Sequence, residues 1–202
     1  MLDGAMRQMI DPVVNRWGQA LAARGWTADG LTLIGLGLGL GSAALLALGV
    51  AGWLALIPLV ASRVADGLDG AVARATQKTD FGGYLDITCD FLFYGAIPLA
   101  FVLRDPGANA VAGAFLLMSF YANGSSFLAY AVLAAKKGME TTDRGIKSLY
   151  FSPGLLEGTE TIGFFGVLCL WPAGFAPLAY VFGTLCFYTF ASRVWLAWRV
   201  FG

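Results

Sequence analysis

The sequence predicts an all-α integral membrane protein with six transmembrane helices, preceded by an N-terminal amphipathic helix in the membrane interface. The chain of 202 residues is 58% hydrophobic and only 13% charged, whereas a soluble domain carries roughly 25% charged residues. Its apolar residues form stretches long enough to cross a bilayer, for which a helix needs about 20 residues. Basic residues concentrate on alternate connections between these stretches, as they do in membrane proteins.

Composition excludes several classes of protein and of site. The chain has no histidine, which excludes zinc sites and catalytic triads that depend on imidazole. The 13 Lys and Arg residues balance 13 Asp and Glu residues, so no net field attracts a nucleic acid and none is expected as a partner. The three cysteines lie in apolar stretches outside any C-x-x-C pair, which favours a packing role.

Residues 1–26 are expected to form the interfacial helix. Val13 and Trp17 recur at helical spacing, with Arg16 and Arg24 on other faces; a soluble cap is the alternative interpretation. Six spans follow in a single membrane domain over residues 1–202, at about 31–50, 53–72, 83–103, 108–135, 155–171 and 175–198. The fourth is long enough to tilt or to project beyond the bilayer.

The basic residues predict the orientation of these spans. They precede the first span, follow the sixth, and lie in the second-to-third and fourth-to-fifth connections: Arg7, Arg16, Arg24, Arg74, Lys78, Lys136, Lys137, Arg144, Lys147 and Arg199. The opposite side carries only Arg104. Both termini and both longer connections are therefore expected to be cytoplasmic.

Four aspartates lie inside the second and third spans, where an ionisable side chain is costly and indicates a functional site. Asp66 and Asp69 are three residues apart, and Asp86 and Asp90 are four apart, so each pair shares one helix face. The two spans are expected to be antiparallel neighbours with both pairs in their cytoplasmic halves. The four carboxylates should therefore converge in one pocket near the cytoplasmic interface.

Such a pocket needs compensating positive charge, from protons, from Arg63 and Arg74, or from metal ions. Ligands that are all oxygen favour Mg²⁺ or Mn²⁺, and two ions that share carboxylates are common where a displacement occurs at phosphorus. Acids neutralised only by protons or arginines are the alternative without a function. Small residues leave room for a polar ligand beside the acids: Gly67, Gly70, Ala73, Gly82 and Gly83.

These residues resemble the signature of the CDP-alcohol phosphatidyltransferase family, D-x-x-D-G-x-x-A-R followed by a spacer and G-x-x-x-D-x-x-x-D. Every fixed residue is present: Asp66, Asp69, Gly70, Ala73, Arg74, Gly82, Asp86 and Asp90. The resemblance implies that the four aspartates bind two divalent metal ions, Mg²⁺ or Mn²⁺. It also implies that Asp90 is the general base on the acceptor hydroxyl, and that the protein is a homodimer.

The resemblance also implies a CDP-binding set. Gly70, Ala73 and Arg74 would contact the CDP group, and Thr79 matches a position that does so in relatives. Members often have P-N-x-x-T before the first span. Here Asp29 and Thr32 occupy the second and fifth positions of that pattern, and they are expected at the same site.

A further segment, residues 147–161, resembles an uncharacterised bacterial inner-membrane branch of the family through its K-S-x-Y and E-G-T-E-T motifs. Glu157 and Glu160 could shape an acceptor site or bind a cationic or polyhydroxyl head group, or Arg144 and Lys147 could instead bind an acceptor phosphate. The alternatives are a helix-terminus charge for Glu157 and membrane anchoring for the basic residues.

The leading interpretation is an enzyme of phospholipid biosynthesis in the inner membrane. It would transfer a phosphatidyl group from CDP-diacylglycerol to an acceptor alcohol, in a metal-dependent reaction that releases CMP at a cytoplasmic active site. One alternative transfers the head group of a soluble CDP-alcohol to diacylglycerol. A cation or proton transporter is another, but the halves of the two spans beyond the acids carry no charge to continue a path.

Overall fold

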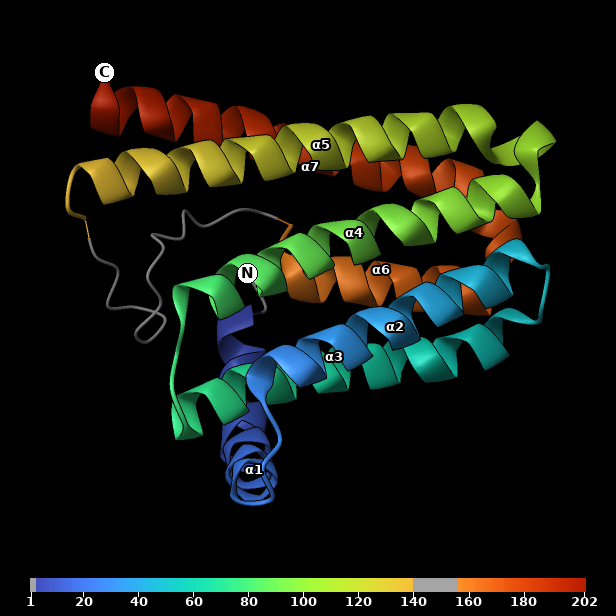
Figure 1. Ribbon diagram of the computed structural model, residues 1–202. Coiled ribbons are helices and arrows are strands. Elements are labelled where there is room, and N and C mark those ends of the chain that lie inside the picture. Colours follow the sequence, from blue (N-terminus) through green and yellow to red (C-terminus); the bar gives the residue numbers. More distant parts are fainter. Residues whose placement is uncertain (1–2, 140–155) are drawn as a thin grey trace.

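The computed structural model describes residues 3–139 and 156–202, and in these residues every regular element is a helix (Figure 1). The elements are α1 (Asp3–Ala23), α2 (Ala28–Ala47), α3 (Gly52–Ala75), α4 (Asp80–Arg104), α5 (Pro106–Lys136), α6 (Gly158–Leu170), the 3₁₀ helix η1 (Pro172–Gly174) and α7 (Phe175–Phe201). Each of the six predicted spans coincides with one of the helices α2 to α7.

Short polar side chains fix where several helices begin. The Thr27 hydroxyl accepts a hydrogen bond from the Gly30 N–H (3.2 Å) at the start of α2. Thr79 accepts one from the Gly82 N–H (2.9 Å) at the start of α4. Asp105 does the same for α5, which has Pro106 in its first turn. Each cap satisfies an N–H that has no partner inside its helix.

Helices α2 to α7 run side by side as a bundle, and α1 crosses one end of it (Figure 1). Helix α2 packs against both α3 and α4, while α4 packs against α5 and α5 against α7. Helix α1 packs on α3, where a Cβ at Gly18 would overlap Ala71. The connection from α3 to α4 lies at the same end as α1.

Four helical segments are long and apolar enough to cross a membrane: α2, α4, α5 and η1–α7. Helix α6 is apolar but has only 13 residues, and α3 carries Arg63, Asp66, Asp69 and Arg74 among its apolar residues. By length and composition, the described residues thus support a membrane protein with four clear spans. The count of six and the interfacial place of α1 remain predictions.

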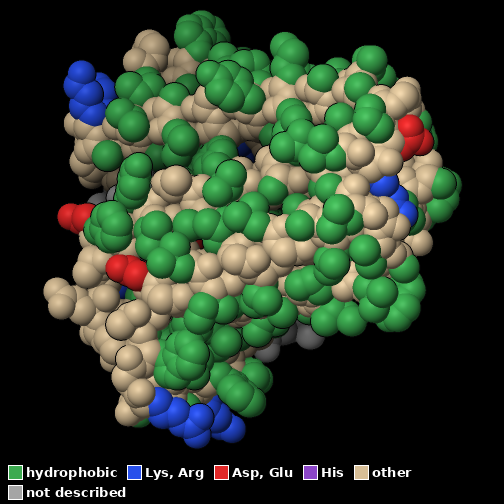
Figure 2. Space-filling model, turned by 45° about the vertical axis from the view of Figure 1, so that its right-hand side comes forward, with side chains coloured by type: hydrophobic (Ala, Val, Ile, Leu, Met, Phe, Trp, Pro, Cys, Tyr) green, Lys and Arg blue, Asp and Glu red, His purple; other side chains and the backbone are tan. Residues whose placement is uncertain are grey.

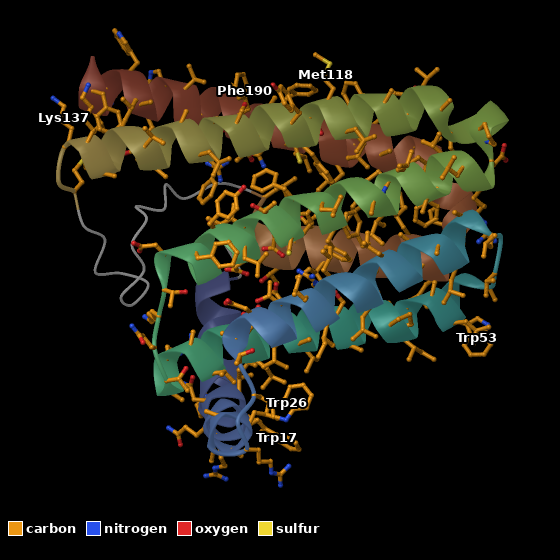
Figure 3. The ribbon with its side chains drawn as sticks, viewed as in Figure 1. Trp17, Trp26, Trp53, Met118, Lys137 and Phe190 are labelled. Atoms are coloured by element: carbon orange, nitrogen blue, oxygen red, sulfur yellow. The ribbon has the colours of Figure 1, made fainter. Side chains whose placement is uncertain are left out.

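The exposed side chains of the bundle are of the kind that face lipid in membrane proteins. Apolar side chains cover most of the face in Figure 2, and charged groups lie toward its edges. Exposed tryptophans lie at both ends: Trp17 and Trp26 beside α1, and Trp53 at the far end of α3 (Figure 3). Tryptophan is enriched at both interfaces of membrane proteins because its ring is apolar and its N–H is polar.

The core of the bundle is rich in phenylalanine. It depends on a glycine of α2, Gly39, that lets the Phe93 ring approach the helix backbone closely. Phe93 and Phe165 are fully buried and meet edge to face. A Cβ at Gly39 of α2 would lie 2.6 Å from the Phe93 ring and 3.0 Å from the Ser62 hydroxyl. At Gly37 and Gly41, on the same helix, it would have no described atom within 4 Å. Only glycine therefore fits at position 39 without displacing Phe93.

We expect Gly39→Ala to lower the melting temperature of the purified protein in detergent, because overpacking a core costs about 1–3 kcal/mol. The matched control is Gly41→Ala, where added helix propensity gives up to about 1 kcal/mol of stabilisation. The three cysteines are buried, so a thiol-reactive dye reports unfolding during heating. Equal melting temperatures for the two variants would contradict this packing.

Candidate active site

Three of the four intramembrane aspartates form a compact group. Oxygens of Asp66, Asp69 and Asp86 all lie within 4.8 Å of one another, and we call this group the three-carboxylate cluster. The i, i+3 spacing on α3 turns Asp66 and Asp69 toward the same side, and Asp86 meets them from α4. The cluster confirms the predicted convergence for these three residues.

Helix α2 contributes a hydrogen bond to the cluster. The Thr32 hydroxyl donates a 2.6 Å hydrogen bond to Asp69 Oδ2, and both side chains are buried. Helices α3 and α4 are neighbours, as predicted, and meet through their polar side chains, as in the ion pair of Arg63 with Asp90. Their backbones pack more closely on α2 than on each other.

Asp90 lies beside the cluster but is not part of it. The Arg63 Nη1 donates a 2.8 Å hydrogen bond to Asp90 Oδ1 and lies 3.5 Å from Asp66 Oδ1. Arg63 is one helical turn before Asp66, so both belong to the same face of α3. The structure therefore connects the fourth aspartate to the cluster through an arginine.

The predicted CDP-binding residues lie around the end of the site where α1 crosses. Gly70 is next to Asp69, and a Cβ there would meet only the Arg74 Nη1 among the described atoms, at 3.4 Å. A Cβ at Gly82 would lie 3.1 Å from Asp29 Oδ1, so Asp29 lies beside the first turn of α4, which Thr79 caps. Ala73 is half-buried on α3. Within the cluster, Asp69 is buried, whereas Asp66 and Asp86 are half-buried.

Helix α1 contributes to this end of the site through Asn15. Its Oδ1 accepts hydrogen bonds from Arg74 Nη2 (2.7 Å) and Nε (3.2 Å). A cavity of about 240 Å³ between α1 and the last turn of α3 is lined by Asn15, Gln19, Ala71, Arg74 and Ala75. The motif arginine is thus held in place by the helix predicted to lie in the interface.

The predicted acceptor-binding residues are only partly described. Arg144 and Lys147 lie outside the described residues. Glu157 and Glu160 form a capping box at the start of α6, in which the Glu157 N–H donates to Glu160 Oε2 at 3.1 Å. The helix-terminus interpretation of Glu157 agrees with this geometry, and the box explains why α6 begins at Gly158 and not at residue 155.

The comparison with known proteins decides the family. The family model for CDP-alcohol phosphatidyltransferases matches residues 26–200. The chain belongs to the CDP-alcohol phosphatidyltransferase family. It is also 47% identical over 197 residues to inner membrane protein YnjF of Escherichia coli (strain K12). The matched region covers 96% of this chain and 94% of YnjF. As a member of this family, the chain is a phosphotransferase of phospholipid biosynthesis.

Two solved structures have the same fold as this family member. Both are phosphatidylinositol phosphate synthase (PgsA1) of Mycobacterium tuberculosis, 21% identical to this chain. The complex with CDP-DAG has a TM-score of 0.70 and covers 93% of this chain and 94% of that one. The complex with manganese and citrate has a TM-score of 0.70 and covers 92% and 88%.

Two polar contacts of this transferase were not predicted. Asn15 was assigned to an interfacial helix, and no local pattern predicts that it contacts Arg74. Arg193 is buried in α7 and donates to Asn123 Oδ1 of α5 at 2.6 Å. Arg193 could have been identified from the sequence, because an arginine inside an apolar span indicates a buried polar contact or a functional site.

We expect Asp69→Asn to weaken Mn²⁺ binding at least about tenfold, which corresponds to about 1.4 kcal/mol, because the amide keeps the shape but removes a charged ligand. Electron paramagnetic resonance of the purified protein in detergent counts free and bound Mn²⁺. The matched control is Asp80→Asn, which removes an exposed acid from the first turn of α4. The same loss in both variants would show that the cluster is not the cation site.

Proposed function

We propose that the protein transfers a phosphatidyl group from CDP-diacylglycerol to the hydroxyl of an acceptor alcohol and releases CMP. The observation that carries this proposal is the convergence of Asp66, Asp69 and Asp86 within a bundle of apolar helices. A site of this kind can bind a charged donor head group while the acyl chains stay in the bilayer. The CDP-DAG bound in the structure of PgsA1 supports this choice of donor.

The residues of the cluster fit divalent metal ions. All of their ligand atoms are carboxylate oxygens, which hard cations such as Mg²⁺ and Mn²⁺ prefer, and manganese is present in one PgsA1 structure. We propose two ions, held by Asp66, Asp69 and Asp86 with Asp90 as a further ligand. When bound, the ions neutralise the pyrophosphate and stabilise the charge that develops on the departing CMP.

The chain's own residues bind the donor and move one proton. Arg74, held by Asn15, pairs with a phosphate of the donor. Gly70 and Ala73 admit the CDP group beside the helix, and Asp29, Thr32 and Thr79 border it. The open sides of Gly67 and Gly83, where a Cβ would meet no described atom within 4 Å, support access of a large polar group.

Asp90 is proposed as the general base. Its carboxylate takes the proton of the acceptor hydroxyl as the alcohol oxygen forms a bond to the phosphorus that carries diacylglycerol. The bond from that phosphorus to the oxygen of CMP breaks, and CMP leaves with the electron pair. Arg144, Lys147, Glu157 and Glu160 are proposed to border the acceptor, two as partners of a phosphate and two as partners of hydroxyl or cationic groups.

We also propose how the chain lies in its membrane. All six helices α2 to α7 would span the inner membrane as one domain, as expected for a relative of inner membrane protein YnjF. Helix α3 would be included because its polar groups face the site. Helix α1 would lie in the interface, and both termini and the active site would be cytoplasmic, as the basic residues indicate. A homodimer is proposed from the family resemblance.

Release of CMP from cytidine-labelled CDP-diacylglycerol tests the function. The purified protein in detergent is given Mn²⁺ or Mg²⁺ and a panel of acceptor alcohols, with and without a phosphate. We expect release that needs a metal and one class of acceptor, and that EDTA abolishes. Asp90→Asn should lower turnover at least about 100-fold, the usual contribution of a general base, while Asp80→Asn should not.

Two results would contradict this proposal. Turnover close to wild type in Asp90→Asn would exclude Asp90 as the base. No release with any acceptor, together with transfer from a soluble CDP-alcohol to diacylglycerol, would assign the reverse choice of donor.

A further inference from the structure

Arg63 is a positive charge built into the acidic site at a position that precedes the family signature. Its side chain is only 10% exposed, although arginine is rarely buried unless it is paired. Its Nη1 lies 2.8 Å from Asp90 Oδ1 and 3.5 Å from Asp66 Oδ1. One guanidinium therefore connects α3 with α4 at the site.

Contacts with α3 and α4, and a hydrogen-bond chain through Ser62 to α2, hold this guanidinium in place. Its Nη2 donates to the Ser62 hydroxyl at 3.0 Å, and that hydroxyl donates to the Gly35 carbonyl of α2 at 2.6 Å. Its central carbon lies 4.0 Å from the centroid of the Phe93 ring on α4, within the range of a cation–π interaction. Phe93 is fully buried against Gly39. Arg63 is thus fixed by packing.

Arg63 lies between the three-carboxylate cluster and Asp90. Asp66, Asp69 and Asp86 cluster within 4.8 Å, and Asp90 forms the short ion pair with Arg63. A guanidinium and a divalent cation repel each other strongly where water is scarce. Arg63 therefore holds Asp90 by an ion pair and opposes the binding of cations at the site.

We propose that Arg63 is a positioning residue, which holds the Asp90 carboxylate beside the three-carboxylate cluster in the orientation that accepts the acceptor's proton, at a cost in cation affinity. This inference rests on the proposed function for the role of Asp90. The proposal predicts that loss of Arg63 changes cation affinity and turnover in opposite directions. Without Arg63, cations bind more tightly because a repelling charge is gone, while turnover falls because Asp90 is no longer held in orientation. A purely structural ion pair would weaken both properties.

The test compares Arg63→Gln and Arg63→Lys with the wild-type protein in detergent. Mn²⁺ is titrated alone and followed by electron paramagnetic resonance. We expect Arg63→Gln to bind Mn²⁺ about tenfold more tightly, because it removes one charge near the ligands. Arg63→Lys keeps the charge and should stay within about twofold of wild type, a difference that is small on the scale of a lost charge.

Turnover is measured on the same samples. We expect Arg63→Gln to lower kcat for CMP release at least about tenfold, with KM for the donor nearly unchanged, because only proton transfer is impaired. Arg63→Lys should restore part of kcat. The matched control is Arg104→Gln, at the other end of α4, where Arg104 donates to the Val50 carbonyl at 2.8 Å. This control should change stability and leave Mn²⁺ affinity unchanged.

Unchanged or weaker Mn²⁺ binding in Arg63→Gln would overturn the proposal. If that variant does not fold, Arg63→Lys decides, since equal kcat in Arg63→Lys and wild type would show that the arginine fork does not position Asp90. Failure of the proposed function can be told apart from failure of the proposed role of Arg63. In the first case the wild-type protein would release no CMP with any acceptor, while the Mn²⁺ titration would still measure the effect of Arg63 on cation affinity.

Discussion

The cost of holding carboxylates inside a bundle of apolar helices is the constraint on which the rest of this structure depends. Each ionised acid loses the water that would stabilise its charge, and burial without a partner is strongly unfavourable. Asp69 is 6% exposed and is compensated by a hydroxyl from Thr32. Asp90 is compensated by Arg63. One arginine among four acids leaves negative charge that divalent cations are suited to balance.

The fold meets this constraint through α2. That helix packs on both α3 and α4 and supplies Thr32 to the cluster and the Gly35 carbonyl to the Ser62–Arg63 chain of hydrogen bonds. Close packing on α2 holds α3 and α4 with their acidic faces toward each other. The same end of the bundle carries α1, whose Asn15 holds Arg74. These contacts join the cluster and the motif arginine to the helices around them.

Much of this arrangement could be predicted from local patterns, and the rest depends on tertiary contacts. Hydropathy located α2 to α7 because apolar length is a property of each segment alone. The spacing of Asp66, Asp69 and Asp86 predicted the cluster because helical periodicity fixes their faces. The pairs Arg63–Asp90 and Asn15–Arg74 join residues 27 and 59 positions apart. Neither pair follows from spacing, because both depend on how separate helices pack.

The central claim is that the cluster on α3 and α4 binds metal ions beside the donor's phosphates. Crystals grown from a lipid mesophase with Mn²⁺ and CDP-diacylglycerol test it, because manganese is located by its anomalous scattering. We expect a manganese peak among Asp66, Asp69 and Asp86 with the pyrophosphate next to it. Donor bound elsewhere, or a peak absent from these carboxylates, would contradict metal binding by the cluster beside the donor.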